Sequence, residues 1–300
     1  MTEGPRSSAA RAEARACEEA RLSIVATPIG NLEDITLRAL RVLRESDAIL
    51  AEDTRHTRAL CTHHGIATPL RSFHAHTADE KVEELTRELA GGARFALVTD
   101  AGTPLVSDPG ARLVSAAAAA GVRVEPIPGP SAALAALSVA GVRAAEFRFA
   151  GFLPRSGGKR KRAIDRVARA REATILFEAP SRVPATLREL CEGVGGERRA
   201  AVCRELTKLF EEVRRGTLAE LAAHYAEEPP RGEVTLVVEG AAEESEEASE
   251  TDPEALARAL LDRGMRTKDA AKELAEILSW TVRDAYAVVL AAAAPESDPE

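Results

Sequence analysis

Small polar residues and glycines follow two candidate strands in this 300-residue chain. The run Phe95–Val98 leads into the segment TDAGTP, and the run Val122–Ile127 leads into PGPSA. This pattern predicts buried strands that end in loops, and ligands bind at such loops in open α/β sheets. Asp100 and Thr103 offer hydrogen-bond donors and acceptors there, while the glycines allow close approach of the backbone. An ordinary strand–turn–helix connection has the same spacing, so the rest of the chain must decide.

Two adjacent carboxylates, Glu52 and Asp53, end another candidate strand, Asp47–Glu52. One of them could lie in the ligand crevice and accept a proton or orient Arg55. The simpler alternative is that Asp53 or Thr54 caps the following helix while Glu52 is solvated. The position at the carboxyl end of a strand favours the first interpretation slightly.

Two further carboxylates, Glu178 and Glu205, lie at the ends of later candidate strands that begin at Thr174 and Arg199. They join the first pair as candidate proton acceptors. An ion pair between Arg204 and Glu205 would explain these residues without catalysis, and this alternative is equally open.

A basic segment interrupts this acidic chain, whose formal net charge is −8. Between Pro154 and Glu172 it carries eight Lys or Arg residues against two acidic ones. Charge runs are usually solvated, but a single-signed run flanked by glycines in an acidic protein favours contact with nucleic-acid phosphates. The residues expected to make that contact are Arg155, Lys159, Arg160, Lys161 and Arg162.

The composition bounds the class of protein. The net negative charge argues against non-specific coating of nucleic acid, and aromatic residues, at 3%, leave few surfaces for base stacking. The four cysteines show no C-x-x-C spacing, so we expect no metal site and no disulfide framework, which suits a reducing cytoplasm. Since no run of 18 apolar residues occurs, no membrane span is expected.

The alternation of strands and helices predicts an α/β protein with two α/β domains. Residues 22–141 contain at least four βα units and form the expected N-terminal domain, and residues 142–240 form a second domain with a mixed sheet. Residues 1–21 are typical of a disordered leader, and the acidic residues 241–252 of a flexible linker. Residues 253–294 are expected to form a small helical module.

Three short amphipathic helices are expected in that module, similar to a helix-turn-helix unit. The apolar face of the first is marked by Leu256, Leu260 and Leu261, and that of the second by Ala270, Leu274 and Ile277. Val282, Tyr286 and Leu290 mark that of the third. Many small helical tails would show the same pattern.

The first loop of the chain, Thr27–Gly30, follows the apolar run Leu22–Ala26. It has neither the G-x-G-x-x-G pattern of dinucleotide-binding loops nor the P-loop pattern. Both of those kinds of nucleotide site are therefore disfavoured.

Six motifs occur in order along the chain: VATPIGNLEDIT, AEDTRHT, LVTDAGTPLVSDPG, PIPGPSA, FEAPSR and RELTK with FEE. Because of these motifs, the chain resembles the tetrapyrrole-methylase superfamily over Leu22 to Ala294. Within that superfamily, it resembles the branch that methylates small-subunit ribosomal RNA. The resemblance implies two α/β domains of the class III methyltransferase type, with S-adenosyl-L-methionine bound in the cleft between them. It also implies a homodimer and 2′-O-methylation of a cytidine ribose in the decoding region of 16S rRNA, in the small ribosomal subunit.

The resemblance also assigns residues to the donor site: Pro28, Ile29, Gly30, Asp100, Gly102, Thr103, Pro104, Val106, Ser131 and Ala132. The superfamily often has an acidic residue where Thr103 stands, so we expect the contact with the donor ribose to fall to Asp100. The candidate catalytic residues beside this site are Glu52, Asp53, Arg55, Glu178 and Glu205. The basic segment would contact the RNA.

Two other functions stay open at this point. A precorrin-type or diphthine-type methyltransferase would share the donor loops, and the first of these would need a wide apolar trough for its macrocycle. A non-catalytic RNA-binding module would fail to bind S-adenosyl-L-methionine. The basic segment and the helical module favour the RNA-directed enzyme.

Overall fold

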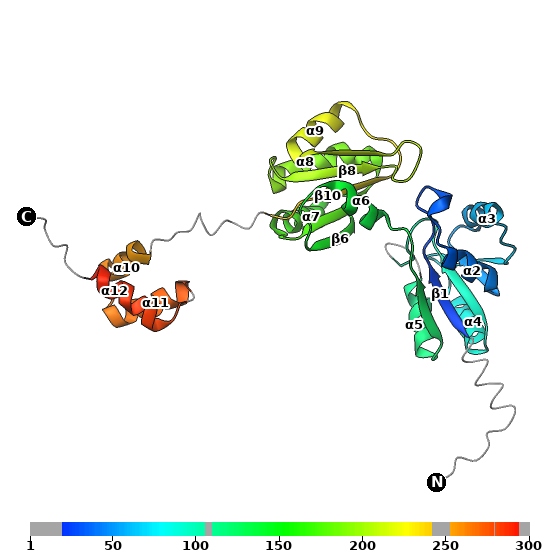
Figure 1. The fold of residues 1–300 in the computed structure, drawn as a ribbon, viewed down its shortest axis with the longest axis horizontal. Helices are drawn as coiled ribbons and strands as arrows, with labels where there is room; N and C mark the ends of the chain where they lie inside the picture. Colours follow the sequence, from blue (N-terminus) through cyan, green and yellow to red (C-terminus); the bar gives the residue numbers. More distant parts are fainter. Residues whose placement is uncertain (1–19, 106–109, 242–252, 279, 294–300) are drawn as a thin grey trace, which may run out of the picture. The chain divides into compact units, whose positions relative to one another are not determined.

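The computed structural model describes residues 20–105, 110–241, 253–278 and 280–293. These fall into two compact units, within Met1–Ala241 and within Ala242–Glu300 (Figure 1). The expected leader and linker lie almost wholly outside the described residues. Across the described ranges, no helix is both long enough and apolar enough to cross a membrane.

All five strands of the first sheet run parallel, in the order β3-β2-β4-β1-β5. The strands are β1 (Arg21–Val25), β2 (Ala48–Ala51), β3 (Leu70–Ser72), β4 (Arg94–Val98) and β5 (Arg123–Ile127). The helices are η1 (Leu32–Asp34, a 3-10 turn), α2 (Leu37–Glu45), α3 (Thr54–His63), α4 (Asp79–Ala90), α5 (Ala111–Ala119) and α6 (Ala132–Ala140). The predicted α/β class is confirmed, and parallel pairing brings the carboxyl ends of all five strands to one edge.

Helices cover both faces of this sheet, because successive side chains of a strand point to opposite sides. From β4, Ala96 and Val98 pack with α2 and α3, whereas Phe95 and Leu97 pack with α4 and α5. A strand buried on both faces has a continuous apolar sequence, which is why β4 was visible as the run Phe95–Val98.

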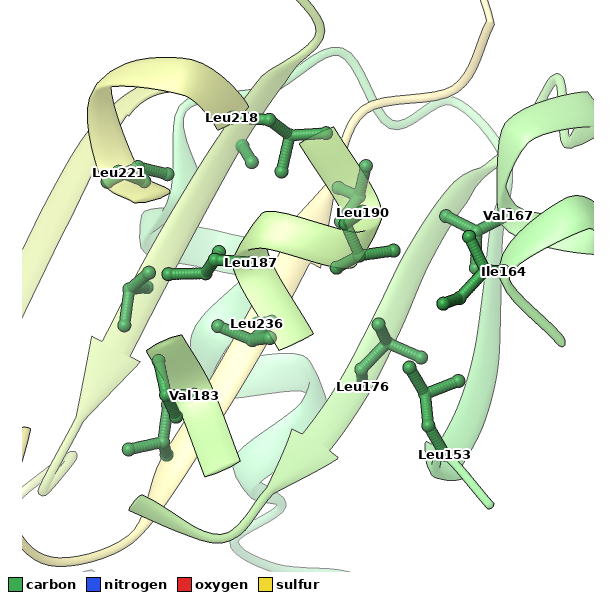
Figure 2. Packing of buried hydrophobic residues seen from close by; sticks show 14 of the residues in the cluster. Leu153, Ile164, Val167, Leu176, Val183, Leu187, Leu190, Leu218, Leu221 and Leu236 are labelled. Carbon is green, nitrogen blue, oxygen red and sulfur yellow. The ribbon is translucent and has the colours of Figure 1, made fainter. Parts of the chain in front are cut away.

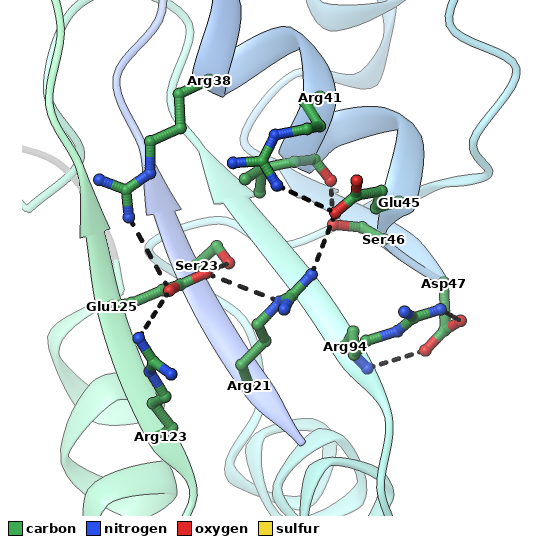
Figure 3. A network of polar contacts seen from close by, with 11 residues as sticks. Arg21, Ser23, Arg38, Arg41, Glu45, Ser46, Asp47, Arg94, Arg123 and Glu125 are labelled. Atoms are coloured by element: carbon green, nitrogen blue, oxygen red, sulfur yellow. Dashed lines mark hydrogen bonds and ion pairs between the residues drawn. The ribbon is translucent and has the colours of Figure 1, made fainter. Parts of the chain in front are cut away.

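A polar network joins β1, β5 and α2 (Figure 3). At its centre, Glu125 of β5 accepts a hydrogen bond from Ser23 Oγ at 2.9 Å. Three arginines surround this carboxylate at N–O distances of 3.5–3.9 Å: Arg21, Arg38 and Arg123. Arg21 also reaches Glu45 at the end of α2, at 3.4 Å. Each such partly exposed pair contributes at most about 1 kcal/mol, so the network adds mainly to the placement of α2.

The second sheet is mixed, as predicted, and has the order β6-β7-β10-β8-β9. The parallel pair is β6 (Phe147–Phe152) with β7 (Ala173–Glu178). The strands β8 (Arg199–Arg204), β9 (Glu212–Thr217) and β10 (Val234–Val238) add antiparallel pairs. The helices are α7 (Gly157–Arg169), η2 (Pro180–Arg182, a 3-10 turn), α8 (Val183–Val194) and α9 (Leu218–Glu227).

Two groups of side chains bury the two faces of the second sheet. Figure 2 shows the face covered by α7, α8 and α9, where Leu176 and Leu236 share a core with Leu187. On the opposite face, Ile175 and Val237 share a core with alanines of α6. Because α6 directly follows the loop after β5, one helix connects the first sheet to the core of the second.

The described part of the second unit consists of α10 (Pro253–Asp262), α11 (Thr267–Leu278) and α12 (Val282–Ala292). Leu260 and Leu274 are buried, as expected, whereas the expectation for Ile277 is wrong because this side chain is exposed. The expected inward face of α12 is wrong, because its three marker residues, Val282, Tyr286 and Leu290, are exposed. Ala285 and Val289 are buried instead. α12 has apolar residues on two faces, and packing buries the face with the smaller side chains.

We expect Leu176→Ala to lower the free energy of unfolding by about 2–5 kcal/mol, because the fully buried side chain would leave a cavity. Leu37→Ala is the matched control, since this leucine is 86% exposed and its loss should cost less than about 0.5 kcal/mol. Urea unfolding followed by circular dichroism measures both. Equal effects would contradict the assignment of the core.

Candidate active site

Three loops at the carboxyl ends of β1, β4 and β5 are tied together by hydrogen bonds. They are the β1 loop (Ala26–Gly30), the β4 loop (Thr99–Pro104) and the β5 loop (Pro128–Ser131). Thr27 N donates to Gly102 O at 2.9 Å, and Gly102 N donates to Thr27 O at 3.1 Å. Thr103 Oγ1 donates to Pro130 O at 3.2 Å. Segments that are far apart in the sequence therefore form one wall.

Two glycines permit this packing. Gly102 has a φ of 80°, a left-handed conformation that side chains disfavour, and a Cβ there would lie 3.4 Å from Ile29 Cγ2. Gly30 lies against the turn between β8 and β9, where a Cβ would overlap the stem of Lys208 and lie 2.9 Å from Leu206 O. The β1 loop therefore fits between the β4 loop and the second sheet.

A cavity of about 420 Å³ lies beside the three loops. Five of the expected donor-site residues line it: Ile29, Gly102, Thr103, Ser131 and Ala132. Ala101 and the second sheet's residues complete the lining: Phe152, Phe177, Glu178, Ala179, Pro180 and residues 232–235. A cavity lined from both sheets, mostly apolar with a few polar groups, is typical of a small-molecule site.

The other expected donor-site residues do not line this cavity. Pro28 and Asp100 line a separate cavity of about 100 Å³ next to α3. Gly30 packs against the β8–β9 turn, and Pro104 is buried. Val106 lies outside the described residues. The expected contact of Asp100 with the donor therefore has no support in this geometry.

Asp53 is the N-cap of α3, which is the simpler of its two interpretations. Its Oδ1 accepts a hydrogen bond from Arg55 N at 2.8 Å, and its Oδ2 accepts one from Arg55 Nη2 at 2.7 Å. The hydrogen bonds from Arg55 hold the pKa of the Asp53 carboxyl far below its usual range, and Asp53 raises the pKa of the Arg55 guanidinium. So weak a base is poorly suited to accept a proton. Asp53 N also donates to Asp100 Oδ1 at 3.0 Å, which occupies that carboxylate.

Glu52 differs from its neighbour in its surroundings. It is half-buried, and its Oε2 accepts a hydrogen bond from Thr99 Oγ1 at 3.1 Å. Because β2 and β4 are adjacent in the sheet, this bond places the carboxylate at the edge where the loops meet.

Glu178 lines the cavity, yet its side chain is fully buried. Its Oε1 accepts a hydrogen bond from Ala179 N at 2.9 Å and lies 3.4 Å from Arg182 Nε. Its Oε2 accepts one from Thr186 Oγ1 at 2.6 Å. With partners on both oxygens, this carboxylate is held in one position at the end of β7.

Glu205 lies in the β8–β9 turn with a left-handed φ of 49°. Its Oε1 accepts hydrogen bonds from Lys208 Nζ at 2.9 Å and from Glu233 N at 2.8 Å. These bonds, that from Lys208 foremost, lower the pKa of the Glu205 carboxyl. The alternative of an Arg204–Glu205 ion pair is not what forms, because Arg204 Nε donates to Glu212 Oε2 at 2.7 Å.

The basic segment divides into exposed and buried residues. Four of its residues are exposed at the beginning of α7: Arg155, Lys159, Lys161 and Arg162. Arg160 is only 6% exposed, and its guanidinium donates hydrogen bonds inside the protein. The expectation that Arg160 contacts nucleic acid is therefore wrong. Arg160 is on the inward stripe of α7 with Ile164 and Val167, since helical residues three, four and seven apart share a face.

Several residues of the cavity were not expected from the sequence. Phe177 stacks edge-to-face on Phe152 with ring centroids 5.7 Å apart. The motif FEAPSR, which begins at Phe177, was a usable signal because it follows a strand. Residues 232–235 had no such signal, since they are only the two residues before β10 and the first two residues of that strand. Among the described residues, no three His, Cys, Asp or Glu side chains gather as a metal site requires.

Known proteins share this arrangement. The family model for tetrapyrrole (corrin/porphyrin) methylases matches residues 21–222. A solved structure of uroporphyrin-III C-methyltransferase from Thermus thermophilus, complexed with S-adenyl homocysteine, has the same fold, with a TM-score of 0.51 and 22% identity over 73% of this chain and 97% of that one. The chain therefore belongs to the tetrapyrrole methylase family.

Two curated relatives define its branch of that family. The ribosomal RNA small subunit methyltransferase I of Mesorhizobium japonicum is 48% identical over 78% of this chain and 80% of its own length. The protein of the same name from Xylella fastidiosa is 46% identical over 85% of this chain and 94% of its own length. Within the methylases, the chain belongs with the ribosomal RNA small subunit methyltransferases I, as the sequence motifs predicted.

Glu205→Gln should lower the free energy of unfolding at neutral pH by about 1–2 kcal/mol, because charge-assisted hydrogen bonds are lost. The pKa of Glu205 is lower in the folded than in the unfolded chain, so its contribution is present above pH of about 4.3 and is lost as the pH falls through the folded-state pKa. The difference from wild type should therefore shrink as the pH is lowered from neutral to below about 4.3. Urea unfolding across this range measures it, with the exposed Glu228→Gln as control. A difference that does not change with pH would rule out the ionised Glu205 as its source.

Proposed function

We propose that this chain transfers the methyl group of S-adenosyl-L-methionine to small-subunit ribosomal RNA, at the ribose 2′-hydroxyl of a cytidine in 16S rRNA. The observation that carries the proposal is the cavity between the sheets, whose lining combines the methylase loops with the beginning of FEAPSR. The names of the relatives at 46–48% identity support the acceptor. The S-adenyl homocysteine complex of a protein with this fold supports the donor.

The cavity has the chemistry that this donor needs. Its volume of about 420 Å³ is within the range of small-ligand sites. Phe152 and Phe177 offer apolar ring faces to a purine, and the Ser131 hydroxyl offers a polar contact. Because Gly102 has no side chain, its backbone itself forms part of the cavity wall. In this proposal Pro28, Gly30 and Asp100 do not contact the donor. They hold the β1 and β4 loops in place.

Methyl transfer from a sulfonium to a hydroxyl forms a C–O bond, breaks an S–C bond and releases the hydroxyl proton. Alignment of the two partners supplies up to about 7–11 kcal/mol of such a barrier, so a strong base is not required. Three of the candidate carboxylates are held by other groups: Asp53, Glu178 and Glu205. We therefore propose Glu52, half-buried at the end of β2, as the group that receives the proton directly or through water.

The exposed cations at the head of α7 supply an RNA contact in this proposal. Arg155 and Lys161 lie at a hollow of about 440 Å³ on the outside of α7 and α8. The largely buried Arg160 and three carboxylates also line it: Asp165, Glu189 and Glu192. A local basic patch on a chain with net charge −8 suits a folded ribosomal particle better than any free polynucleotide.

We also propose that the enzyme acts as a homodimer in the cytoplasm, as its motifs imply. The exposed apolar side chains Leu134, Leu209 and Phe210 are candidates for burial in a dimer.

The decisive experiment incubates the protein with methyl-labelled S-adenosyl-L-methionine and small subunits that lack the modification, then maps the label. We expect one labelled cytidine, with the label on its ribose. The RNA-free protein should bind the donor as well, which calorimetry measures. Label on a base, or no label on RNA, would overturn the acceptor assignment, and absence of donor binding would overturn the enzyme itself.

Replacing the four exposed residues of the α7 head by Ala should weaken RNA binding at least about tenfold. The slope of the logarithm of the RNA association constant against the logarithm of the salt concentration should decrease in magnitude by about one for each phosphate that is no longer neutralised. Donor affinity should be unchanged. Arg169→Ala is the control, because this exposed arginine lies at the other end of the same helix. An unchanged salt slope in the fourfold variant would place the RNA-binding surface elsewhere.

A further inference from the structure

Arg160 is the buried cation of an otherwise exposed basic segment. Its Nε donates to Glu189 Oε2 at 2.7 Å, its Nη1 to Pro154 O at 3.1 Å and its Nη2 to Thr186 Oγ1 at 2.9 Å. Burying a guanidinium is unfavourable unless its N–H groups are hydrogen-bonded, and here each nitrogen has a partner. The side chain is therefore part of the interior.

Thr186 connects Arg160 to the wall of the cavity. Its fully buried hydroxyl accepts the hydrogen bond from Arg160 and donates one to Glu178 Oε2 at 2.6 Å. A hydroxyl has one donor and two acceptor sites, so it can serve both neighbours at once. Arg160 Nη1 itself lies 4.0 Å from Glu178 Oε2, so the threonine makes the closer contact.

The same cluster holds two parts of the cavity wall from behind. The segment Glu178–Pro180 lines the cavity after β7. Arg160 and Arg182 both donate to Pro154 O, at 3.1 and 3.4 Å, and Pro154 lies two residues after Phe152, which also lines the cavity. The ends of β6 and β7 are thereby fixed by one set of hydrogen bonds.

We propose that Arg160 and Thr186 are positioning residues of the donor site: they hold Glu178, and with it the segment Glu178–Pro180, in the place that S-adenosyl-L-methionine requires. Neither residue lines the cavity, so each acts through Glu178. The proposal rests on the proposed function, because it takes the cavity to be the donor site. It assigns to Arg160 a role distinct from that of the four exposed cations beside it.

The test compares two substitutions at Thr186 in the full-length protein. Thr186→Val keeps the shape of the side chain but removes the hydroxyl, whereas Thr186→Ser keeps the hydroxyl. Binding of S-adenosyl-L-homocysteine is measured by calorimetry on protein that circular dichroism shows to be folded. We expect Thr186→Val to raise the Kd about tenfold, since buried groups lose a partner, and Thr186→Ser to stay within about twofold of wild type.

Another buried threonine, Thr174 on β7, provides the control. Thr174 is 1% exposed, and its Oγ1 has no hydrogen-bond partner among the described residues. Thr174→Val should therefore leave the Kd unchanged, whereas a general loss of packing would move both valine variants alike. If Thr186→Val does not fold, Arg160→Lys takes its place, with Lys161→Met on the outer face of α7 as its control.

The outcomes separate this inference from the proposed function. A wild-type protein that binds S-adenosyl-L-homocysteine, together with an unchanged Kd in Thr186→Val or in Arg160→Lys, overturns the positioning role alone. A wild-type protein that does not bind it overturns both. A raised Kd that Thr186→Ser restores supports the positioning role, because a purely structural defect lowers the folded fraction without changing the affinity of what is folded.

Discussion

Two backbone hydrogen bonds between Thr27 and Gly102 determine where the parts of the site lie. β1 and β4 are parallel neighbours, and their pairing ends with the strands. Beyond that point the two loops would be free to diverge, but the bridge joins them as a short antiparallel pair. Ile29 is thereby carried to the cavity, and Gly30 to the β8–β9 turn of the second sheet. Since the bridge uses only main-chain atoms, it depends on the conformation of Gly102 rather than on any functional side chain.

Three of the candidate carboxylates are held by hydrogen-bond donors that lie close to them in sequence. Asp53 is held by Arg55, Glu205 by Lys208, and Glu178 by Thr186 with Arg182 alongside. Each pairing fixes a loop or a strand end, and the pairings of Asp53 and Glu205 also lower the pKa of those carboxyls. Of these three carboxylates, Glu178 alone lines the cavity, while Asp53 and Glu205 hold the segments beside it.

Much of the first sheet and its loops was predictable, because strands buried on both faces are continuous apolar runs that end in glycine and proline. The short strand β3 has no such pattern and was not visible. In the site, the loops after β1, β4 and β5 were identified, but the wall contributed by β10 was not, because nothing marks the beginning of an ordinary strand as functional. Arg160 was assigned to the exposed face of α7 because it lies within the contiguous basic run Lys159–Arg162. Its spacing from Ile164 and Val167 was the signal that helical periodicity could have supplied.

The position of α6 has a consequence for motion. The helix is continuous in sequence with the β5 loop, yet its alanines are buried against Ile175 and Val237. Hinge bending between the sheets would have to occur within Pro128–Ser131, where two prolines restrict φ, or else strip α6 from its core. Neither is easily achieved. A ligand must then enter by small displacements of loops and side chains, and the backbone amides of α6 should exchange with solvent about as slowly as those of the central strands beneath it.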